Sequence, residues 1–295
     1  MIPKRLSLLV IALLALSVTA CADTRIEKTL DLAPGGQFVL QSDGGSVTVT
    51  GSSASGARIV VTSNRDDLQS LYDLNFESSG GVARVTARKK TFQWFSNIHL
   101  HFEVTVPSQT RVNVKTGGGS IKVSSLQGAQ DLHTSGGSIE ATDVQGDVLA
   151  RTSGGSVRIQ NVQGGADLGT SGGSITVNSL SGTLQANTSG GPIRIDGVGG
   201  RVNAHTSGGS INATFARGNN QGGELGTSGG SIHVNLDPAA NLNIDASTSG
   251  GSVSTDLKVS VIGTISHSKL HGTLGSGGPT LALHTSGGSI HIGSI

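Results

Sequence analysis

The chain has 295 residues and a mass of 29.6 kDa, enough for one large domain or two small ones. Glycine supplies 46 of these residues, more than twice the usual share of roughly 7%, and only 13% are charged. Paired glycines exclude collagen, an apolar content of 35% disfavours disorder, and the net charge of +1 gives no reason to expect nucleic acid as a partner.

Residues 1–20 are predicted to be a lipoprotein signal peptide. Lys4 and Arg5 precede an apolar run over residues 6–18, which is too short to span a bilayer but typical of a secretory signal. The run ends in Val-Thr-Ala-Cys, which resembles a bacterial lipobox. Cys21 is the only cysteine and therefore forms no internal disulfide, so we expect it to be lipidated. The alternative is an ordinary secretory signal with a cysteine just past the cut.

The predicted location is the bacterial cell envelope, with the chain anchored to a membrane through Cys21. Removal of residues 1–20 leaves 18 basic and 19 acidic residues, a formal charge of −1. Ala22 follows the cysteine, a pattern that resembles the sorting signal for the outer membrane in enteric bacteria. The sequence leaves open which side of the membrane the protein faces.

Residues 21–115 are predicted to form a strand-rich region that begins and caps the regular repeat. This region holds seven of the eight aromatic residues. A short helix or loop is expected at Asp66–Tyr72.

One stretch of this region, residues 88–95, combines positive charge with aromatic rings. Arg88, Lys89, Lys90 and Trp94 form a candidate contact surface for lipid headgroups, a glycan or a partner protein. The alternative is that the aromatic rings cover the open end of the repeat.

Residues 116–295 repeat the segment Thr-Ser-Gly-Gly-Ser-Ile. The serine after each glycine pair recurs every eighteen residues from Ser120 to Ser210, with Pro192 in one slot. Spacings of twenty-one lead to Ser252, and thirty-seven residues, about two units, lead to Ser289. Counted from this serine, positions two, four, seven and thirteen are apolar, position nine is glycine and position fifteen is threonine.

The repeat predicts an all-β fold, a single-stranded parallel β-solenoid with 18-residue rungs. Apolar residues at positions two and four indicate a strand with one buried face, and glycines able to take a positive φ mark the corners. Like residues then stack about 4.8 Å apart, on a path expected to be right-handed. The alternative, an antiparallel meander, leaves a long apolar face without a partner layer.

The last forty residues are predicted to add strands and a β-hairpin-like insertion near Gly-Ser-Gly-Gly-Pro at residues 275–279. No linker is long enough to separate two independent domains.

The repeats resemble the bacterial β-strand-repeat family of unknown function known as putative adhesins. The closing pattern Lys-Leu-His-Gly-Thr-Leu-Gly at residues 269–275 and the strand end Val-Thr-Val-Pro at residues 104–107 also fit this family. The resemblance covers most of residues 25–295. It implies a β-strand repeat and an adhesin-like role and brings no catalytic motif.

The spacing of the histidines does not predict a metal site. His133, His205 and His284 share position fourteen, but the first two are four rungs apart, about 19 Å, whereas zinc ligands lie about 2 Å from the metal. His99 and His101 are expected on one strand and are interpreted as surface residues.

The charged residues of the repeat indicate structural roles, not catalysis. Asp131 and Asp167 share position twelve, about 10 Å apart, near the carboxyl separation of inverting glycosidases, but no other catalytic group converges with them. At position three, stacked charges are expected to form a surface ladder: Lys122, Glu140 and Arg158.

The sequence therefore predicts a non-enzymatic envelope lipoprotein that displays a β-solenoid as an adhesin or surface scaffold. Its predicted partners are the membrane and a glycan or protein ligand, and neither cofactor nor metal is implied. One alternative is a periplasmic partner protein in envelope regulation. A less favoured one is a polysaccharide-active β-helix enzyme.

Overall fold

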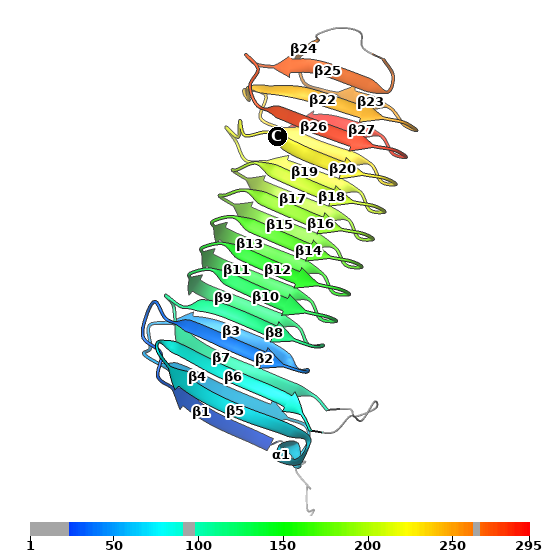
Figure 1. The fold of residues 1–295 in the computed structure, drawn as a ribbon. Coiled ribbons are helices and arrows are strands. Elements are labelled where there is room, and N and C mark those ends of the chain that lie inside the picture. Colours follow the sequence, from blue (N-terminus) through cyan, green and yellow to red (C-terminus); the bar gives the residue numbers. More distant parts are fainter. Residues whose placement is uncertain (1–23, 91–97, 262–265) are drawn as a thin grey trace, which may run out of the picture.

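The computed structural model describes residues 24–90, 98–261 and 266–295. They form a long rod built from two sheets that face each other (Figure 1). Within these ranges the only helix is the single turn α1 (Leu68–Leu71), where the sequence predicted a short helix or loop. No helix of the described chain is long and apolar enough to span a membrane. Cys21 and Trp94 lie outside the described residues.

Sheet A has 13 strands and sheet B has 14. In spatial order from the N-terminal end of the rod, sheet A consists of β1 (Thr24–Leu30), β4 (Ala57–Ser63), β7 (Leu100–Pro107), β3 (Ser46–Ser52), β9 (Ile121–Gln127), β11 (Ile139–Gln145), β13 (Val157–Gln163), β15 (Ile175–Leu180), β17 (Ile193–Val198), β19 (Ile211–Phe215), β21 (Ile232–Leu236), β27 (Ile290–Ser294) and β23 (Val253–Thr255). In the same direction, sheet B consists of β5 (Tyr72–Ser79), β6 (Val82–Lys89), β2 (Gln37–Ser42), β8 (Arg111–Thr116), β10 (Gln130–Thr134), β12 (Val148–Thr152), β14 (Ala166–Thr170), β16 (Leu184–Thr188), β18 (Val202–Thr206), β20 (Gly223–Thr227), β26 (Thr280–Thr285), β22 (Leu242–Thr248), β25 (Lys269–Leu274) and β24 (Val259–Val261).

Each repeat unit forms one rung, with one strand in sheet A and the next in sheet B. Successive units pair in parallel and in register, so that Ile139 lies beside Val157, and Val157 beside Ile175. The predicted parallel β-solenoid with 18-residue rungs is confirmed. The antiparallel meander is wrong, because the repeat strands pair in parallel in both sheets.

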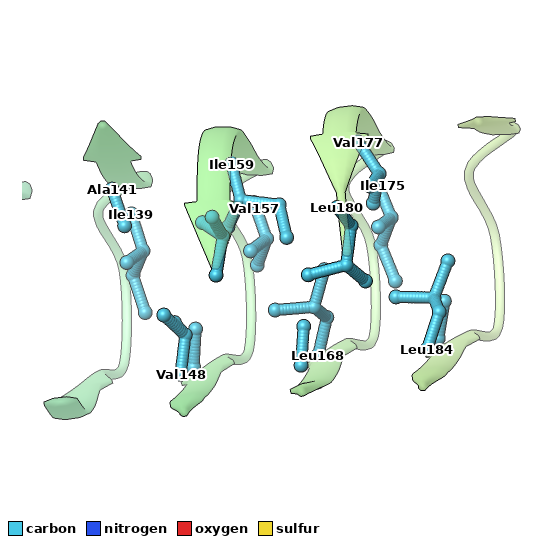
Figure 2. Close-up of a cluster of buried hydrophobic side chains, with 14 of the residues drawn as sticks. Ile139, Ala141, Val148, Val157, Ile159, Leu168, Ile175, Val177, Leu180 and Leu184 are labelled. Atoms are coloured by element: carbon cyan, nitrogen blue, oxygen red, sulfur yellow. The ribbon is translucent and has the colours of Figure 1, made fainter. Parts of the chain in front are cut away.

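The core is a narrow column of aliphatic side chains between the sheets (Figure 2). Ile139, Val157 and Ile175 point inward from sheet A and are at most 1% exposed. Val148 and Leu168 meet them from sheet B, equally buried. Burial of about 25 cal/mol per Å² of apolar surface makes this stacked column the main source of stability.

A left-handed residue lies inside the sheet A strands β9, β11, β13, β15 and β17, between positions four and seven. Positions four and seven both face the core although they differ by three. Because side chains of a regular strand share a face only at every second residue, the alternation must be broken between them. The residue at position six supplies the break by taking a positive φ and standing outside the ladder register. In order along the rod these residues are Ser125, Asp143, Asn161, Ser179 and Gly197, with φ from 54 to 70°.

The second glycine of each pair is required by a close approach of backbones. The sequence analysis expected positive φ at the pairs, but neither Gly154 nor Gly155 has one. A Cβ on Gly155 would instead lie 2.0 Å from the carbonyl oxygen of Gly137 in the preceding rung. The first glycine has room, because a Cβ on Gly154 would lie 3.6 Å from the nearest atom.

The N-terminal cap departs from chain order. The rung β2–β3 lies between the rung β6–β7 and the first regular rung, β8–β9. Antiparallel strands β5, β4 and β1 then cover the outer side. Both sheets continue without a break past residues 115 and 116, the end of β8.

The C-terminal end shows the same kind of exchange. The last rung of the sequence, β26–β27, is inserted between β20–β21 and β22–β23. Ser289 therefore lies between Ser231 and Ser252, not two units beyond Ser252. The consecutive strands β24 and β25 pair antiparallel and match the predicted hairpin-like insertion near residues 275–279. Residues 275–279 themselves join β25 to β26, which lie on opposite sides of β22.

Candidate binding groove

A long open groove follows one edge of the rod, where the strands of sheet B end and the Ser-Gly-Gly corners begin. It consists of two hollows, of about 850 Å³ and 810 Å³, which adjoin at Arg151 and Thr152. The larger hollow extends to Ser286 near the C-terminal end, and the smaller one extends to Arg88 and Lys89 in the cap.

Positions fourteen, fifteen and sixteen of successive rungs line this groove. Position fourteen faces outward near the end of each sheet B strand, because it alternates with the buried residue at position thirteen. In spatial order, the residues at this position are Lys115, His133, Arg151, Gly169, Asn187, His205, Gly226, His284 and Ser247.

Two glycines at position fourteen leave room for the side chain of the preceding rung. A Cβ on Gly169 would lie 2.8 Å from Cδ of Arg151, and one on Gly226 would lie 2.6 Å from Nδ1 of His205. The Arg151 and His205 side chains therefore lie over these glycines. The guanidinium of Arg151 reaches Asp167, at 2.6 Å.

The threonines at position fifteen use their hydroxyls in hydrogen bonds that stabilise the fold. The Thr152 hydroxyl donates to the carbonyl of Gly137 at 2.8 Å and accepts the N–H of Gly155 at 3.3 Å. Equivalent bonds recur along the rod, and the threonines are buried. The sequence analysis expected hydroxyls to hydrogen-bond along the stack, and they do so by joining glycines of adjacent rungs.

The serines at position sixteen do not use their hydroxyls in this way. Ser153 and Ser171 are exposed, and within the described residues their hydroxyls make no hydrogen bond. The same holds for the other serines at this position that line the groove, whereas the β8 rung has Gly117 and the β2 rung has Asp43 in their place. These serines stand in order at Ser135, Ser153, Ser171, Ser189, Ser207, Ser228, Ser286 and Ser249.

The described residues of the predicted contact surface do not lie together. Arg88 and Lys89 line the smaller hollow with Lys115, Arg151 and the carboxylate Asp43. Lys90 points elsewhere, because its Nζ donates to the carbonyl of Gln69 in α1 at 2.8 Å.

The two aspartates considered for catalysis lie outside both hollows. Asp131 accepts from Nδ2 of Asn113 and pairs with Nε2 of His133, both at 2.6 Å. Asp167 pairs with Arg151, and Leu149 stands between the two aspartates in the register.

The histidines do not gather into one cluster. His133 and His205 are four rungs apart, as the sequence predicted, but His205 and His284 are only two rungs apart because of the inserted rung. The expectation that His99 and His101 share a strand is wrong, since β7 begins at Leu100. In the described ranges no three His, Cys, Asp or Glu side chains are grouped as metal ligands.

Shifted pKa values mark structural contacts of the cap and the corners. A hydrogen bond from Arg58 lowers the pKa of Glu27 in the cap, at 2.6 Å. Burial raises the pKa of the Tyr72 phenol. Backbone N–H groups of Ala239 and Gly218 lower the pKa of Asp237.

The position-three ladder is present on the opposite sheet. Glu140 lies between Lys122 and Arg158 in the register, and Lys122 Nζ is 3.5 Å from the Glu140 carboxylate. Both side chains of that pair are about half exposed, so the pair contributes at most about 1 kcal/mol.

Solved structures similar to this chain include three from Parabacteroides and Bacteroides species. A protein from Parabacteroides distasonis described as a "putative lipid binding protein" has a TM-score of 0.54 and 15% identity, over 92% of this chain and 96% of that one. A "putative adhesin" from Bacteroides fragilis has a TM-score of 0.42 and 11% identity, over 94% and 98%. Another from Parabacteroides merdae has 0.43 and 12%, over 92% and 95%. At 15% identity the likeness to the Parabacteroides distasonis protein extends to the fold alone.

No curated protein matches the chain. A family model does match it, over residues 36–293, a range that contains the rod from β2 to β27 almost completely. The family carries the description Toastrack DUF4097. With the paired sheets and the 18-residue rungs, this match shows that the chain belongs to the Toastrack DUF4097 family.

Proposed function

We propose that the chain is a non-catalytic binding protein of the bacterial cell envelope, anchored by a lipid on Cys21 and displayed as an adhesin or surface scaffold. The observation that carries this proposal is the groove, which presents polar side chains at successive rungs along a rigid rod. Small-molecule sites usually enclose most of their ligand, whereas an open groove of this length suits an extended one.

The start of the rod supports an anchor at Cys21. Thr24 begins β1, the edge strand of sheet A at the outer end of the cap, and Cys21 precedes it by three positions. A lipid on Cys21 holds the cap end at the bilayer. The regular rungs then follow the cap, and the groove stays open along the side of the rod.

The carboxylates support a role without catalysis. Glycosidases place two carboxyl groups across one scissile bond. Asp131 and Asp167 do not line the groove, and their carboxylates pair with His133 and Arg151. Among the described residues the carboxylates that line the groove, Asp43 and Glu224, belong to different hollows.

Binding measurements test the central claim. The mature chain, made soluble by Cys21→Ser, is expected to bind at least one member of a panel of immobilised glycans, matrix proteins and whole bacterial or host cells. The absence of binding across the whole panel would overturn the proposal.

Protease shaving of intact cells tests the display. A surface adhesin is cleaved, and Cys21→Ser abolishes incorporation of labelled fatty acid and releases the chain from the membrane. Protection from the protease, together with crosslinking to an inner-membrane protein, would instead favour the periplasmic regulatory role.

A further inference from the structure

We infer that the basic section of the groove binds an extended acidic polysaccharide whose axis lies along the rod. The basic section is formed by Arg88, Lys89, Lys115 and Arg151 in the smaller hollow. This inference rests on the proposed binding function and adds the chemical class of the ligand.

Positive charge in this section is mostly unopposed. Asp43, the one carboxylate that lines the hollow among the described residues, accepts the backbone N–H of Lys89 at 2.8 Å. Asp73 stands opposite Arg88 in the β5–β6 register, but among the described residues no ion pair reaches Arg88, Lys89 or Lys115. These three side chains are exposed, and a cleft lined by one sign of charge concentrates anions.

The spacing of the polar groups fits a linear polymer. Lys115, His133 and Arg151 occupy one position on successive rungs, about 4.8 Å apart in a straight line. This distance is comparable to the rise of one sugar ring in an extended polysaccharide. A sugar carboxylate can therefore meet a cation at every second rung while the chain stays parallel to the groove.

Free hydroxyls accompany the cations. Ser135 and Ser153 line the same hollow and are exposed, and their hydroxyls make no hydrogen bond within the described residues. A hydroxyl both donates and accepts, which matches the hydroxyl groups of a sugar. Cations and hydroxyls together fit an acidic sugar better than either a neutral sugar or a simple anion.

Arg151 has a fixed position at the inner end of the basic section. Asp167 holds one side of its guanidinium at 2.6 Å, and the absence of a side chain at Gly169 gives it room. A guanidinium has five N–H donors, so others remain for a ligand carboxylate. The arrangement reduces the conformational freedom that Arg151 loses on binding.

Other polyanions fit less well. Single-stranded nucleic acid is held by aromatic rings on which bases stack, and among the described residues none that lines this hollow is Phe, Tyr or Trp. A bilayer presents a flat surface, whereas Lys115 and Arg151 lie along a groove on the side of the rod.

The test compares ligands and charge-reversed variants of the mature Cys21→Ser chain. The probes are polygalacturonate and hyaluronate, with dextran, single-stranded DNA and phosphatidylglycerol vesicles as the contrasting ligands. The groove variant is Lys89→Glu/Lys115→Glu. The matched control is Arg201→Glu/Lys258→Glu, an equal charge change at exposed residues that line neither hollow.

We expect the unmodified groove to bind an acidic glycan but not dextran, with affinity that falls as salt rises. The groove variant should weaken binding at least about tenfold, and the control should leave it unchanged. If charge reversal unfolds the protein, Lys89→Gln/Lys115→Gln should show a smaller loss in the same direction.

Three results would overturn the inference and leave the proposed binding function standing, provided that some ligand of the wider panel is bound. They are failure to bind either acidic glycan, an equal effect of the groove and control variants, and tighter binding to DNA or vesicles. Binding to nothing in the wider panel would instead remove both proposals.

Discussion

The hydroxyl of Thr170 donates a hydrogen bond to the carbonyl of Gly155 in the preceding rung, with Oγ1 2.7 Å from the oxygen. It also accepts the N–H of Gly173, at 3.2 Å, so one buried side chain joins two corners. The next residue, Ser171, is exposed and makes no side-chain hydrogen bond within the described chain. Of these two adjacent hydroxyls, that of Thr170 joins neighbouring rungs and that of Ser171 faces the groove.

Thr170→Val removes the hydroxyl and nearly preserves the shape. The carbonyl of Gly155 then loses a partly buried hydrogen bond, which should lower the free energy of unfolding by about 1–3 kcal/mol. Denaturant titration measures this loss. The matched control is Ser171→Ala, which should change stability by less than about 0.5 kcal/mol. Equal effects of the two substitutions would show that the threonine contact does not matter.

Gly155→Ala should destabilise the rod much more than Gly154→Ala. The added methyl at residue 155 would lie 2.0 Å from the Gly137 carbonyl oxygen, and this contact is relieved only by separating two rungs. At residue 154 the nearest atom lies 3.6 Å away, an ordinary contact. Thermal unfolding of the two variants provides the comparison. Similar melting temperatures would contradict the close approach.

The sequence predicted the regular part of the rod because each rung depends on local spacing. Ile139 beside Val157 follows from an 18-residue period and alternating apolar residues. The same reasoning identified the glycine at residue 155 but attributed it to positive φ, since the approach of Gly137 exists only in the stacked rungs.

The exchanged rungs at the two ends had no local signal. Ser289 lies between Ser231 and Ser252 because β26 and β27 pair with strands on both sides. These pairings join residues far apart in the sequence. The basic section of the groove depends on a similar exchange. Arg88 on β6 and Lys115 on β8 line one hollow because both strands pair with β2, from opposite sides. Their proximity therefore was not predictable from spacing alone.

Ser179 offers a test of the left-handed residue at position six. Its φ is 59° and its side chain is exposed, so backbone conformation dominates any effect of substitution. Ser179→Val should lower stability by about 1–2 kcal/mol, because a β-branched residue is strained in this region. Ser179→Gly should be neutral or stabilising. If valine and glycine behave alike in denaturant titrations, position six does not need this conformation.

Asp237 should make the stability of the rod depend on pH in the acid range. Its Oδ1 accepts the N–H of Ala239 at 2.9 Å, and its Oδ2 accepts the N–H of Gly218 at 3.0 Å. These bonds hold the pKa of this carboxyl below its ordinary value. Because the folded pKa is lower than the unfolded one, the contribution is complete above about pH 4 and is lost as the pH falls through the folded pKa.

Asp237→Asn separates this effect from general acid denaturation. An amide oxygen can replace one accepted bond but carries no charge, so the variant should melt lower than the wild type near neutral pH. The difference should shrink toward about pH 2, where the wild-type carboxyl is protonated. Glu224→Gln is the control, since that side chain lies in the groove and makes no ion pair among the described residues. A gap between Asp237→Asn and wild type that stays constant from neutral to acid pH would show that the Asp237 charge does not stabilise this corner.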